Sequence, residues 1–331
     1  MSNSLEQPLV SIVLPVKDHL RFIDARLDSI LYQDYANWTC HVIDGCSTDG
    51  TWQRIVERVG KDPRFQLEQR EPRGIYDAWN YGIRSAKGQY LYIATSDDTM
   101  EPNGISSFVA HLEQYPACGM AHCNLRIIDE HGQNVEPNPW DKYLPQQFYG
   151  SKMKELHIRK APVDGLLHSV LFTIYTSVTQ LFFRRSVFDE VGLFSLQFGA
   201  KADFEWGMRA SLIVDVLHVP EYLATWRTHQ EQVTAKESRS KSSVYKELAL
   251  MVESASVSGI FSSKYLSRYY RSRIVEIGCI ERPKRFQRLI FIMMQFFKDP
   301  LAVIEYFKCK GVNPLQVASI KLAESGFNNK P

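Results

Sequence analysis

The sequence predicts an α/β protein with a doubly wound, mainly parallel sheet, and three observations support this fold class. Short apolar segments alternate with longer ones in which apolar residues recur every three or four positions. The first short segment, Val10–Val16, is almost continuously apolar, which is typical of a parallel strand covered on both faces. Acidic residues follow the ends of two such segments, at Asp44 and at Asp97 and Asp98. This order of strands and helices predicts right-handed crossovers and a sheet edge that collects the acids.

The first part of the chain carries the most regular pattern. Pro15 is expected to end the first strand, and Gly88 to follow the end of the third helix. Pro102 stands where a fourth helix would begin. The expected strands are residues 10–16, 38–43, 65–68 and 89–94, and the expected helices are residues 19–31, 52–59 and 75–86 and the helix from Pro102.

The pattern becomes less regular after Met120. A hairpin is expected at residues 124–135 and irregular structure over the top of the sheet at 136–170. Strands are expected at 179–183 and 214–219, with an amphipathic helix from Ala202 between them. From about residue 241 the sequence is helical by pattern. We therefore expect an α/β domain over residues 8–232 and a basic helical C-terminal region over 233–331.

Composition limits the class of protein. Of the 331 residues, 44% are hydrophobic and 23% are charged, which is ordinary for a soluble globular chain. The N-terminal residues lack the basic and apolar regions of a signal peptide. The most apolar stretch, residues 289–297, is shorter than the roughly 20 residues that span a bilayer. The six cysteines show no metal or redox spacing, so we expect reduced thiols and a cytoplasmic protein.

Three acidic segments are candidates for ligand binding. Asp44 opens a turn rich in Gly and Ser, Asp97 and Asp98 end a predicted strand, and Asp203 begins a predicted helix. Turns and helix N-caps select the same residues, so a structural interpretation stays open for each segment taken alone. Parallel strands release their carboxyl ends at one edge, which favours a common site. Carboxylate oxygens at that edge suit a hard divalent cation, which in turn binds phosphate.

Five motifs in order resemble those of family 2 inverting glycosyltransferases, over residues 8 to about 234. They are Val-Ser-Ile-Val-Leu-Pro-Val at residue 10, Asp-Gly-Cys-Ser-Thr-Asp-Gly-Thr at 44, Gly-Ile-Tyr-Asp-Ala-Trp-Asn-Tyr-Gly-Ile at 74, Ser-Asp-Asp at 96 and Ala-Asp-Phe-Glu-Trp at 202. The segment at 74 is most similar to the bacterial subgroup that builds surface polysaccharides. The resemblance implies a GT-A fold, in which a doubly wound nucleotide-binding sheet is joined to an acceptor-binding half.

The resemblance also implies roles for individual residues. Asp203 aligns with the catalytic base, and Asp98 with a direct metal ligand. Arg227 and His229 match a segment that closes over the diphosphate and the metal, and Asp97 would lie near the ribose or the metal. The other positions expected around the nucleoside are Pro15, Asp18, Asp44 and Asp77.

These roles imply a metal-dependent inverting glycosyltransferase of polysaccharide biosynthesis. It would move a hexosyl or N-acetylhexosaminyl group from a nucleotide-diphosphate sugar, expected to be UDP-linked, to a glycan or lipid-linked acceptor. Inversion requires one base to remove the proton of the acceptor hydroxyl. Mn²⁺ or Mg²⁺ can neutralise the leaving diphosphate in place of a general acid.

Two positions depart from the family pattern. Ala202 precedes the implied base where the family often has Glu, a change that the polysaccharide subgroup tolerates. Val178 and Thr179 stand where relatives in that subgroup often have His-Gln. Because the second position faces the acceptor half, the identity of the acceptor transfers less well than the donor chemistry.

Two other functions stay in consideration. A nucleotidyltransferase also uses a metal and an α/β sheet, but it normally has a Gly-rich basic loop after the first strand, and Lys17-Asp18-His19 is not such a loop. A non-catalytic nucleotide- or glycan-binding protein on the same fold would not need both Asp98 and Asp203. Nucleic acid is not an expected partner, because no known reader motif accompanies the basic residues.

The C-terminal region holds the positive charge of the chain. Residues 1–230 carry 22 Lys and Arg and 28 Asp and Glu, a net charge of −6, whereas residues 231–331 carry 17 and 9, a net charge of +8. Basic residues between Lys264 and Arg288 lie beside apolar ones such as Phe286 and Leu289. Such a region either lies on an anionic membrane leaflet, at the inner face of the cell membrane, or packs on the catalytic domain as a solvated helical subdomain. Both interpretations stay open.

Overall fold

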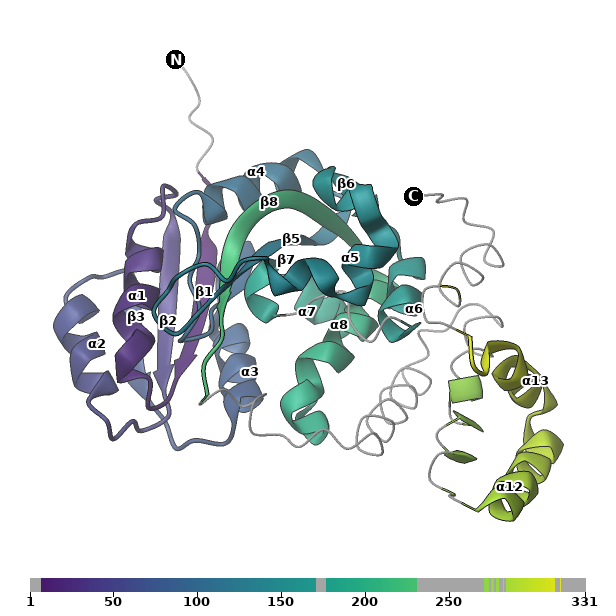
Figure 1. Ribbon diagram of the computed structural model, residues 1–331. Helices are drawn as coiled ribbons and strands as arrows, with labels where there is room; N and C mark the ends of the chain where they lie inside the picture. Colours follow the sequence, from purple (N-terminus) through teal and green to yellow (C-terminus); the bar gives the residue numbers. More distant parts are fainter. Residues whose placement is uncertain are drawn as a thin grey trace.

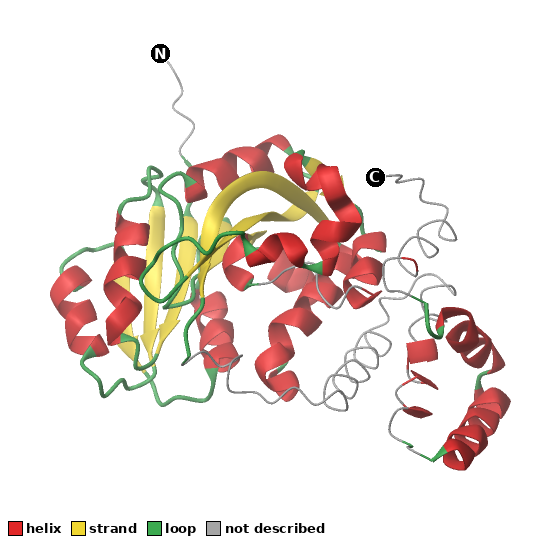
Figure 2. Cartoon of the chain, in the orientation of Figure 1, coloured by secondary structure: helices red, strands yellow, loops and turns green. Residues whose placement is uncertain are grey.

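An eight-stranded mixed sheet with helices on both faces forms the centre of the molecule (Figure 1; Figure 2). The computed structural model describes residues 7–170 and 177–230, and in the C-terminal region residues 271–273, 275, 276, 278, 279, 282, 284–312 and 316. The strands lie in the order β3-β2-β1-β4-β7-β5-β8-β6. The predicted α/β fold class is confirmed. The boundary expected near residue 232 lies outside the described residues.

The first four strands form the parallel part of the sheet. β1 pairs in parallel with β2 and β4, and β2 pairs in parallel with β3. These strands are β1 (Val10–Val16), β2 (Trp38–Asp44), β3 (Phe65–Gln69) and β4 (Tyr90–Ile93). The helices that follow them are α1 (Leu20–Leu31), α2 (Thr51–Val59), α3 (Ile75–Ser85) and α4 (Gly104–Gln114). All eight elements lie close to their predicted ranges.

Pro15 does not end the first strand as predicted. β1 continues to Val16 and pairs Pro15 with Ile43 of β2. On the other side of β1, the pairing with β4 stops at Val13, whose carbonyl accepts the N–H of Ala94. The imino nitrogen of Pro15 faces this side beyond the end of β4, so the strand loses no ladder hydrogen bond there.

Alternate residues of the parallel strands face two different helix layers. Ile12 and Leu14 of β1 belong to a core that includes α1, α2 and α4, whereas Val13 belongs to the core that includes α3. Both faces are therefore covered, which explains why these strands are almost continuously apolar. Since β1, β2 and β4 are parallel, the residues that follow them meet at one edge of the sheet.

The second half of the domain adds antiparallel pairs. β7 (Leu181–Arg184) is antiparallel to both β4 and β5 (Cys118–Ile128). β8 (Asp215–Arg227) is parallel to β5 and antiparallel to the edge strand β6 (His157–Arg159). The expected hairpin at 124–135 is confirmed only next to its turn, where Ile128 forms an antiparallel bridge with Asn134 and the Val135 N–H donates to the Ile127 carbonyl. The rest of that range is wrong, because β5 pairs there with β8.

The segment from 136 to 170, expected to be irregular, is largely structured. It contains α5 (Leu144–Tyr149), α6 (Val163–Val170), two 3-10 helices and β6. Each of these elements has eight residues or fewer. At that length the apolar period of a helix does not repeat often enough to predict one.

A buried helix replaces the amphipathic one expected from Ala202. After a 3-10 helix at Val178–Gln180 and α7 (Val187–Val191), α8 spans Ala202–Ile213. Every residue of α8 from Glu205 to Leu212 is buried. The Glu205 carboxylate accepts two hydrogen bonds from the Arg209 guanidinium, at 2.8 and 2.9 Å, so this charged pair is satisfied inside the core.

The described C-terminal residues form helices, as predicted. α12 (Arg285–Lys298) and α13 (Pro300–Cys309) share a small core with Val275 and Cys279. The end of α13 packs on the main domain, because Cys309 and Val312 contact the core that includes α3 and α8. None of the helices that the structure describes is long and apolar enough to cross a membrane.

Candidate active site

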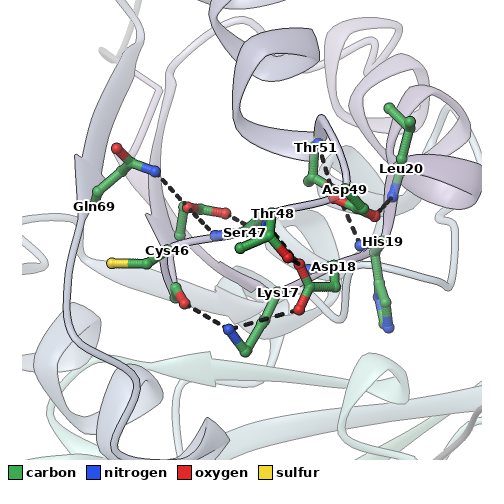
Figure 3. A network of polar contacts seen from close by, with 12 residues as sticks. Lys17, Asp18, His19, Leu20, Cys46, Ser47, Thr48, Asp49, Thr51 and Gln69 are labelled. Atoms are coloured by element: carbon green, nitrogen blue, oxygen red, sulfur yellow. Dashed lines mark hydrogen bonds and ion pairs between the residues drawn. The ribbon is translucent and has the colours of Figure 1, made fainter.

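Two loops at the carboxyl edge, after β1 and after β2, are joined by hydrogen bonds (Figure 3). We call residues 17–20 and 46–51 the loop clasp. The Asp18 carboxylate accepts the N–H of Thr48 at 2.7 Å, and the Ser47 hydroxyl accepts the N–H of Asp18 at 2.9 Å. The Asp49 carboxylate accepts the N–H of Leu20 at 3.0 Å. These bonds hold Asp18 at a φ of 51°, a backbone conformation that L residues rarely adopt.

Asp44 lies beneath the loop clasp and is fully buried. Its carboxylate accepts hydrogen bonds from the backbone N–H and the hydroxyl of Ser47, at 2.9 and 2.5 Å, and from the Gln69 amide at 2.9 Å. It is not among the residues that line the neighbouring cavity. In this structure Asp44 supports the loop, and the nucleoside contact that the resemblance implied stays a prediction.

A cavity of about 940 Å³ opens beside the loop clasp. This volume suits a ligand of nucleotide size. Three of the implied nucleotide-side residues line it, namely Pro15, Asp18 and Asp77. The cations that line it are Lys17, Arg21, Arg70 and Arg73. The cavity thus offers positive charge for an anionic ligand next to the acids of the sheet edge.

Asp97 and His229 form a pair at the same edge. The Nε2 atom of His229 lies 3.0 Å from Oδ2 of Asp97, and the Asp97 side chain is 16% exposed. Burial would raise the pKa of Asp97, but the hydrogen bond from His229 and the nearby His19 lower it below its ordinary value. His19 also contacts Ser96, with 2.5 Å between Nδ1 and Oγ. The sequence reasoning did not single out His19.

Asp97 and His229 are the two groups at this edge that would hold a divalent cation. A carboxylate oxygen suits hard cations and a neutral imidazole nitrogen suits transition metals, so the ion would replace the proton of their hydrogen bond. Among the described residues, no group of three His, Cys, Asp or Glu side chains is placed to hold a metal. Phosphate oxygens and water would therefore supply the other ligands.

Asp98, the implied direct metal ligand, points into the protein. Its side chain is 1% exposed, Oδ1 accepts the N–H of Arg227 at 2.7 Å, and Oδ2 accepts the hydroxyl of Thr95. Burial and the adjacent Asp97 carboxylate raise the pKa of Asp98 to about 7. The structure thus places Asp97, and not Asp98, beside His229, and Asp98 fixes the end of β8 to the acidic loop.

Arg227 does not line the cavity. Its guanidinium donates to the carbonyl oxygens of Asp97 and Asp129, at 2.7 and 3.1 Å, and the residue is 5% exposed. Arg227 therefore holds the loop after β4 against the turn after β5. The diphosphate contact implied by the resemblance stays a prediction.

Arg26 of α1 is a buried cation that the sequence reasoning missed. Its Nε atom donates to the carbonyl of Thr95 at 2.6 Å, two residues before Asp97. It follows Ile23 by three residues and precedes Ile30 by four, so it lies on the apolar stripe of the helix. A charged residue on a buried stripe was the signal that could have identified it.

Asp203, the implied base, lies at the start of α8 and contacts the element that lines the cavity. Its Oδ1 atom accepts the hydroxyl of Tyr76 at 3.0 Å. Tyr76 stands between Ile75 and Asp77, which both line the cavity. Burial raises the pKa of Asp203 to about 6. The fold thus joins a single basic carboxylate of the second half to the donor-side helix α3, across 127 residues of sequence.

Comparison with known proteins agrees with this geometry. Residues 11–171 match Glycosyl transferase family 2. An uncharacterized glycosyltransferase of Rickettsia felis is 26% identical over 232 residues, which are 69% of this chain and 36% of that protein. WcaA of Escherichia coli, named for glycosyl transfer in colanic acid biosynthesis, is 31% identical over 120 residues, 35% of this chain and 42% of that protein. The chain thus spans less than half the length of either relative.

Solved structures share the fold. TarS 1–349 of S. aureus, in complex with UDP-GlcNAc, has a TM-score of 0.60 at 14% identity and covers 96% of this chain and 92% of its own. The mannosyltransferase PcManGT of Pyrobaculum calidifontis, in complex with GDP-Man and Mn²⁺, has a TM-score of 0.55 at 16% identity and covers 99% and 89%. The sheet with its acidic edge is therefore a GT-A-like fold, and residues 11–171, which contain four of the five motifs apart from Val10, match glycosyl transferase family 2.

Proposed function

We propose that the protein is a metal-dependent inverting glycosyltransferase. It transfers a hexosyl or N-acetylhexosaminyl group from a UDP-linked sugar to a glycan or lipid-linked acceptor in surface polysaccharide biosynthesis. The observation that carries the proposal is the placement of Asp203, a partly buried carboxyl with a raised pKa that is hydrogen-bonded to the helix lining the cavity. It is separate from the acids at the sheet edge, as a base that faces the acceptor should be.

The chemistry follows from the state of Asp203. With its pKa raised to about 6, the carboxyl is a stronger base than an ordinary aspartate and is still ionised near pH 7. It takes the proton of the acceptor hydroxyl while that oxygen forms a bond to the anomeric carbon. The bond from this carbon to the diphosphate breaks on the opposite side, which inverts the configuration.

The sugar donor would bind in the cavity and against the acidic edge of the sheet. Lys17 and Arg70 are among the cations that line the cavity, and Asp97 and His229 would hold Mn²⁺ or Mg²⁺. Such an ion supplies positive charge to the leaving diphosphate. The Mn²⁺ complex of PcManGT and the UDP-GlcNAc complex of TarS are the comparisons that support this part of the proposal.

The acceptor and the location are the remaining parts of the proposal. The similarity to WcaA supports a role in the synthesis of a surface polysaccharide. No disulfide joins any of the six cysteines, all of which lie among the described residues; this is usual for proteins of a reducing compartment and supports a cytoplasmic location. We place the enzyme at the inner face of the cell membrane, where lipid-linked acceptors are accessible.

A donor panel tests the proposal. The purified chain is incubated with UDP-, GDP- and dTDP-sugars, with and without Mn²⁺, and release of the nucleoside diphosphate is measured. We expect metal-dependent turnover of one donor class, and we expect Asp203→Asn to lower it at least about 100-fold while nucleotide binding persists. Asp189→Asn, an exposed acid on α7, is the matched control and should retain the parent rate.

Two results would overturn the proposal. Unchanged turnover in Asp203→Asn would remove Asp203 as the base. Release of pyrophosphate from a nucleoside triphosphate, in place of nucleoside diphosphate from a sugar donor, would identify a nucleotidyltransferase.

A further inference from the structure

The outer side of α12 exposes an unusual amount of apolar surface. None of the 14 residues of this helix is buried, and Phe286 and Phe297 are 73% and 84% exposed. Apolar residues at positions 286, 289, 290, 293 and 297 follow the i, i+3, i+4, i+7 pattern, extended to i+11, so they share one side of the helix. We call this surface the α12 apolar face, formed by Phe286, Leu289, Ile290, Met293 and Phe297. Folded monomers rarely leave contiguous patches of this kind in water without a use for them.

The other side of α12 packs on the small C-terminal core. Phe291 and Ile292 contact this core, and the Arg282 guanidinium lies 4.1 Å from the centre of the Phe291 ring. An ion pair of 3.2 Å links Arg271 to Asp299, the residue between α12 and α13. The helix therefore has one side that packs on protein and one that does not. In Figure 1, α12 lies at the opposite end of the molecule from β3.

Positive charge surrounds the α12 apolar face. Residues 284–310 contain six Lys and Arg and two acids, Asp299 and Glu305, which gives a net charge of +4. The basic residues, all exposed, are Lys284, Arg285, Arg288, Lys298, Lys308 and Lys310. Exposed apolar side chains also continue on α13, with Leu301, Ile304 and Phe307. An apolar stripe bordered by cations complements the anionic interface of a lipid bilayer.

We propose that the α12 apolar face binds the surface of an anionic lipid bilayer. Its apolar side chains enter the boundary between headgroups and acyl chains, while Arg285 and Lys298 contact the lipid phosphates. Of the two arrangements that the sequence left open, the exposure of α12 favours the membrane-bound one. This inference does not depend on glycosyl transfer, because lipid binding requires neither donor nor acceptor.

Vesicle co-sedimentation of the full chain tests the proposal. The vesicles contain phosphatidylcholine alone or phosphatidylcholine with phosphatidylglycerol, and no nucleotide sugar is added. We expect the parent protein to bind the anionic vesicles only, more weakly at high salt. Phe286→Ser with Phe297→Ser should weaken binding at least tenfold. Arg285→Gln and Lys298→Gln together should weaken it about 25-fold, at about fivefold for each charge.

Two controls keep the result interpretable. Tyr32, at the end of α1, is 71% exposed and lies outside the α12 apolar face, so Tyr32→Ser should bind vesicles as the parent does. Circular dichroism should show the same helix content in all variants, because the substituted side chains are exposed. No binding by the parent protein, or equal binding by the Phe variant, would overturn the proposal. A parent dimer that the Phe variant converts to a monomer, without vesicle binding in either, would identify a second copy of the chain as the true occupant.

Discussion

Tyr76 is the residue that joins the two halves of the candidate site. Its hydroxyl donates to Asp203, and its neighbours in sequence line the cavity. The bond stabilises the ionised carboxylate, so it lowers the pKa of Asp203 from the value that burial alone would give. Tyr76 therefore acts as a positioning residue that also sets the basicity of Asp203.

Tyr76→Phe should shift the pH dependence of kcat/KM. Loss of the donor raises the pKa of Asp203 above about 6, so the acid limb of the profile should move up by roughly half to one pH unit. Activity at pH 6 should fall several-fold, while activity at pH 8 should change little. Tyr81→Phe is the matched control, because Tyr81 lies on the same helix and donates to Glu68 instead. A profile that does not move would show that the Tyr76 hydroxyl has only a structural role.

The two adjacent acids should respond differently to the same substitution. Asp97→Ala removes the carboxylate beside His229, so we expect Mn²⁺ to lose its effect on UDP binding, measured by thermal shift. Asp98→Ala removes the acceptor for the N–H of Arg227, so we expect a lower melting temperature with the Mn²⁺ effect retained. The opposite result would restore Asp98 as the metal ligand.

At the scale of elements, the loop clasp fixes the wall of the cavity before any ligand binds. The Asp49 carboxylate accepts the N–H groups of Leu20 and Thr51, at 3.0 and 2.9 Å, and the Thr51 hydroxyl at 2.5 Å. Asp49→Ala should therefore lower the free energy of unfolding by about 1–3 kcal/mol, as measured by urea denaturation. Asp34→Ala, an exposed acid after α1, should leave it unchanged. An Asp49→Ala protein as stable as the parent would show that the clasp does not need this side chain.

The elements that the sequence predicted well are those with a repeating pattern. β1 to α4 follow from apolar runs and helical stripes, and the runs are clearest in β1, β2 and β4, which are covered on both faces. β8 was expected to stop at Val219, but Pro220 and Glu221 lie inside the strand. Register shifts opposite Asn124 of β5 accommodate them, and the strand continues to Arg227.

The sequence predicted which residues belong to the candidate site but not how their side chains are arranged. The motifs identified Asp97, Asp98, Asp203 and His229, yet which acid faces His229 depends on hydrogen bonds to distant residues such as Arg227. The contact between Tyr76 and Asp203 joins residues 127 positions apart, and no local period carries that information.

At the scale of the whole molecule, a buried polar cluster distinguishes the second half of the domain. Four of its histidines, His122, His157, His168 and His218, lie near Arg159. Burial, together with this guanidinium, lowers the pKa of each, to about 4 for His157. The folded state therefore keeps them neutral where the unfolded state takes up protons. Stability that is present above pH 6.5 is lost as the pH falls below that value.

His157→Gln should reduce this pH dependence. The unfolded state of this variant binds one proton fewer in excess of the folded state. Between pH 6 and 4.5 the free energy of unfolding should therefore depend on pH less steeply, by up to about 1.4 kcal/mol per pH unit. Asp164 and Asp203, whose pKa values are raised to about 6, oppose the trend in both proteins, so the comparison isolates His157. His131→Gln, at a side chain that is 71% exposed, should leave the slope unchanged. Equal slopes in parent and His157→Gln would exclude the cluster as the cause.

The two edge strands of the sheet bear on the proposed binding of the protein to a lipid bilayer. The edge strands are β3, with five residues that include Gln66 and Glu68, and β6, with three. Confinement to two dimensions would bring copies close together, and long open edges would then invite strand pairing between them. Both edge strands are short, and both contain polar or charged residues. Another copy of the chain therefore finds few free backbone groups with which to pair. The chain can therefore be concentrated on a bilayer with little risk of aggregation through its own sheet.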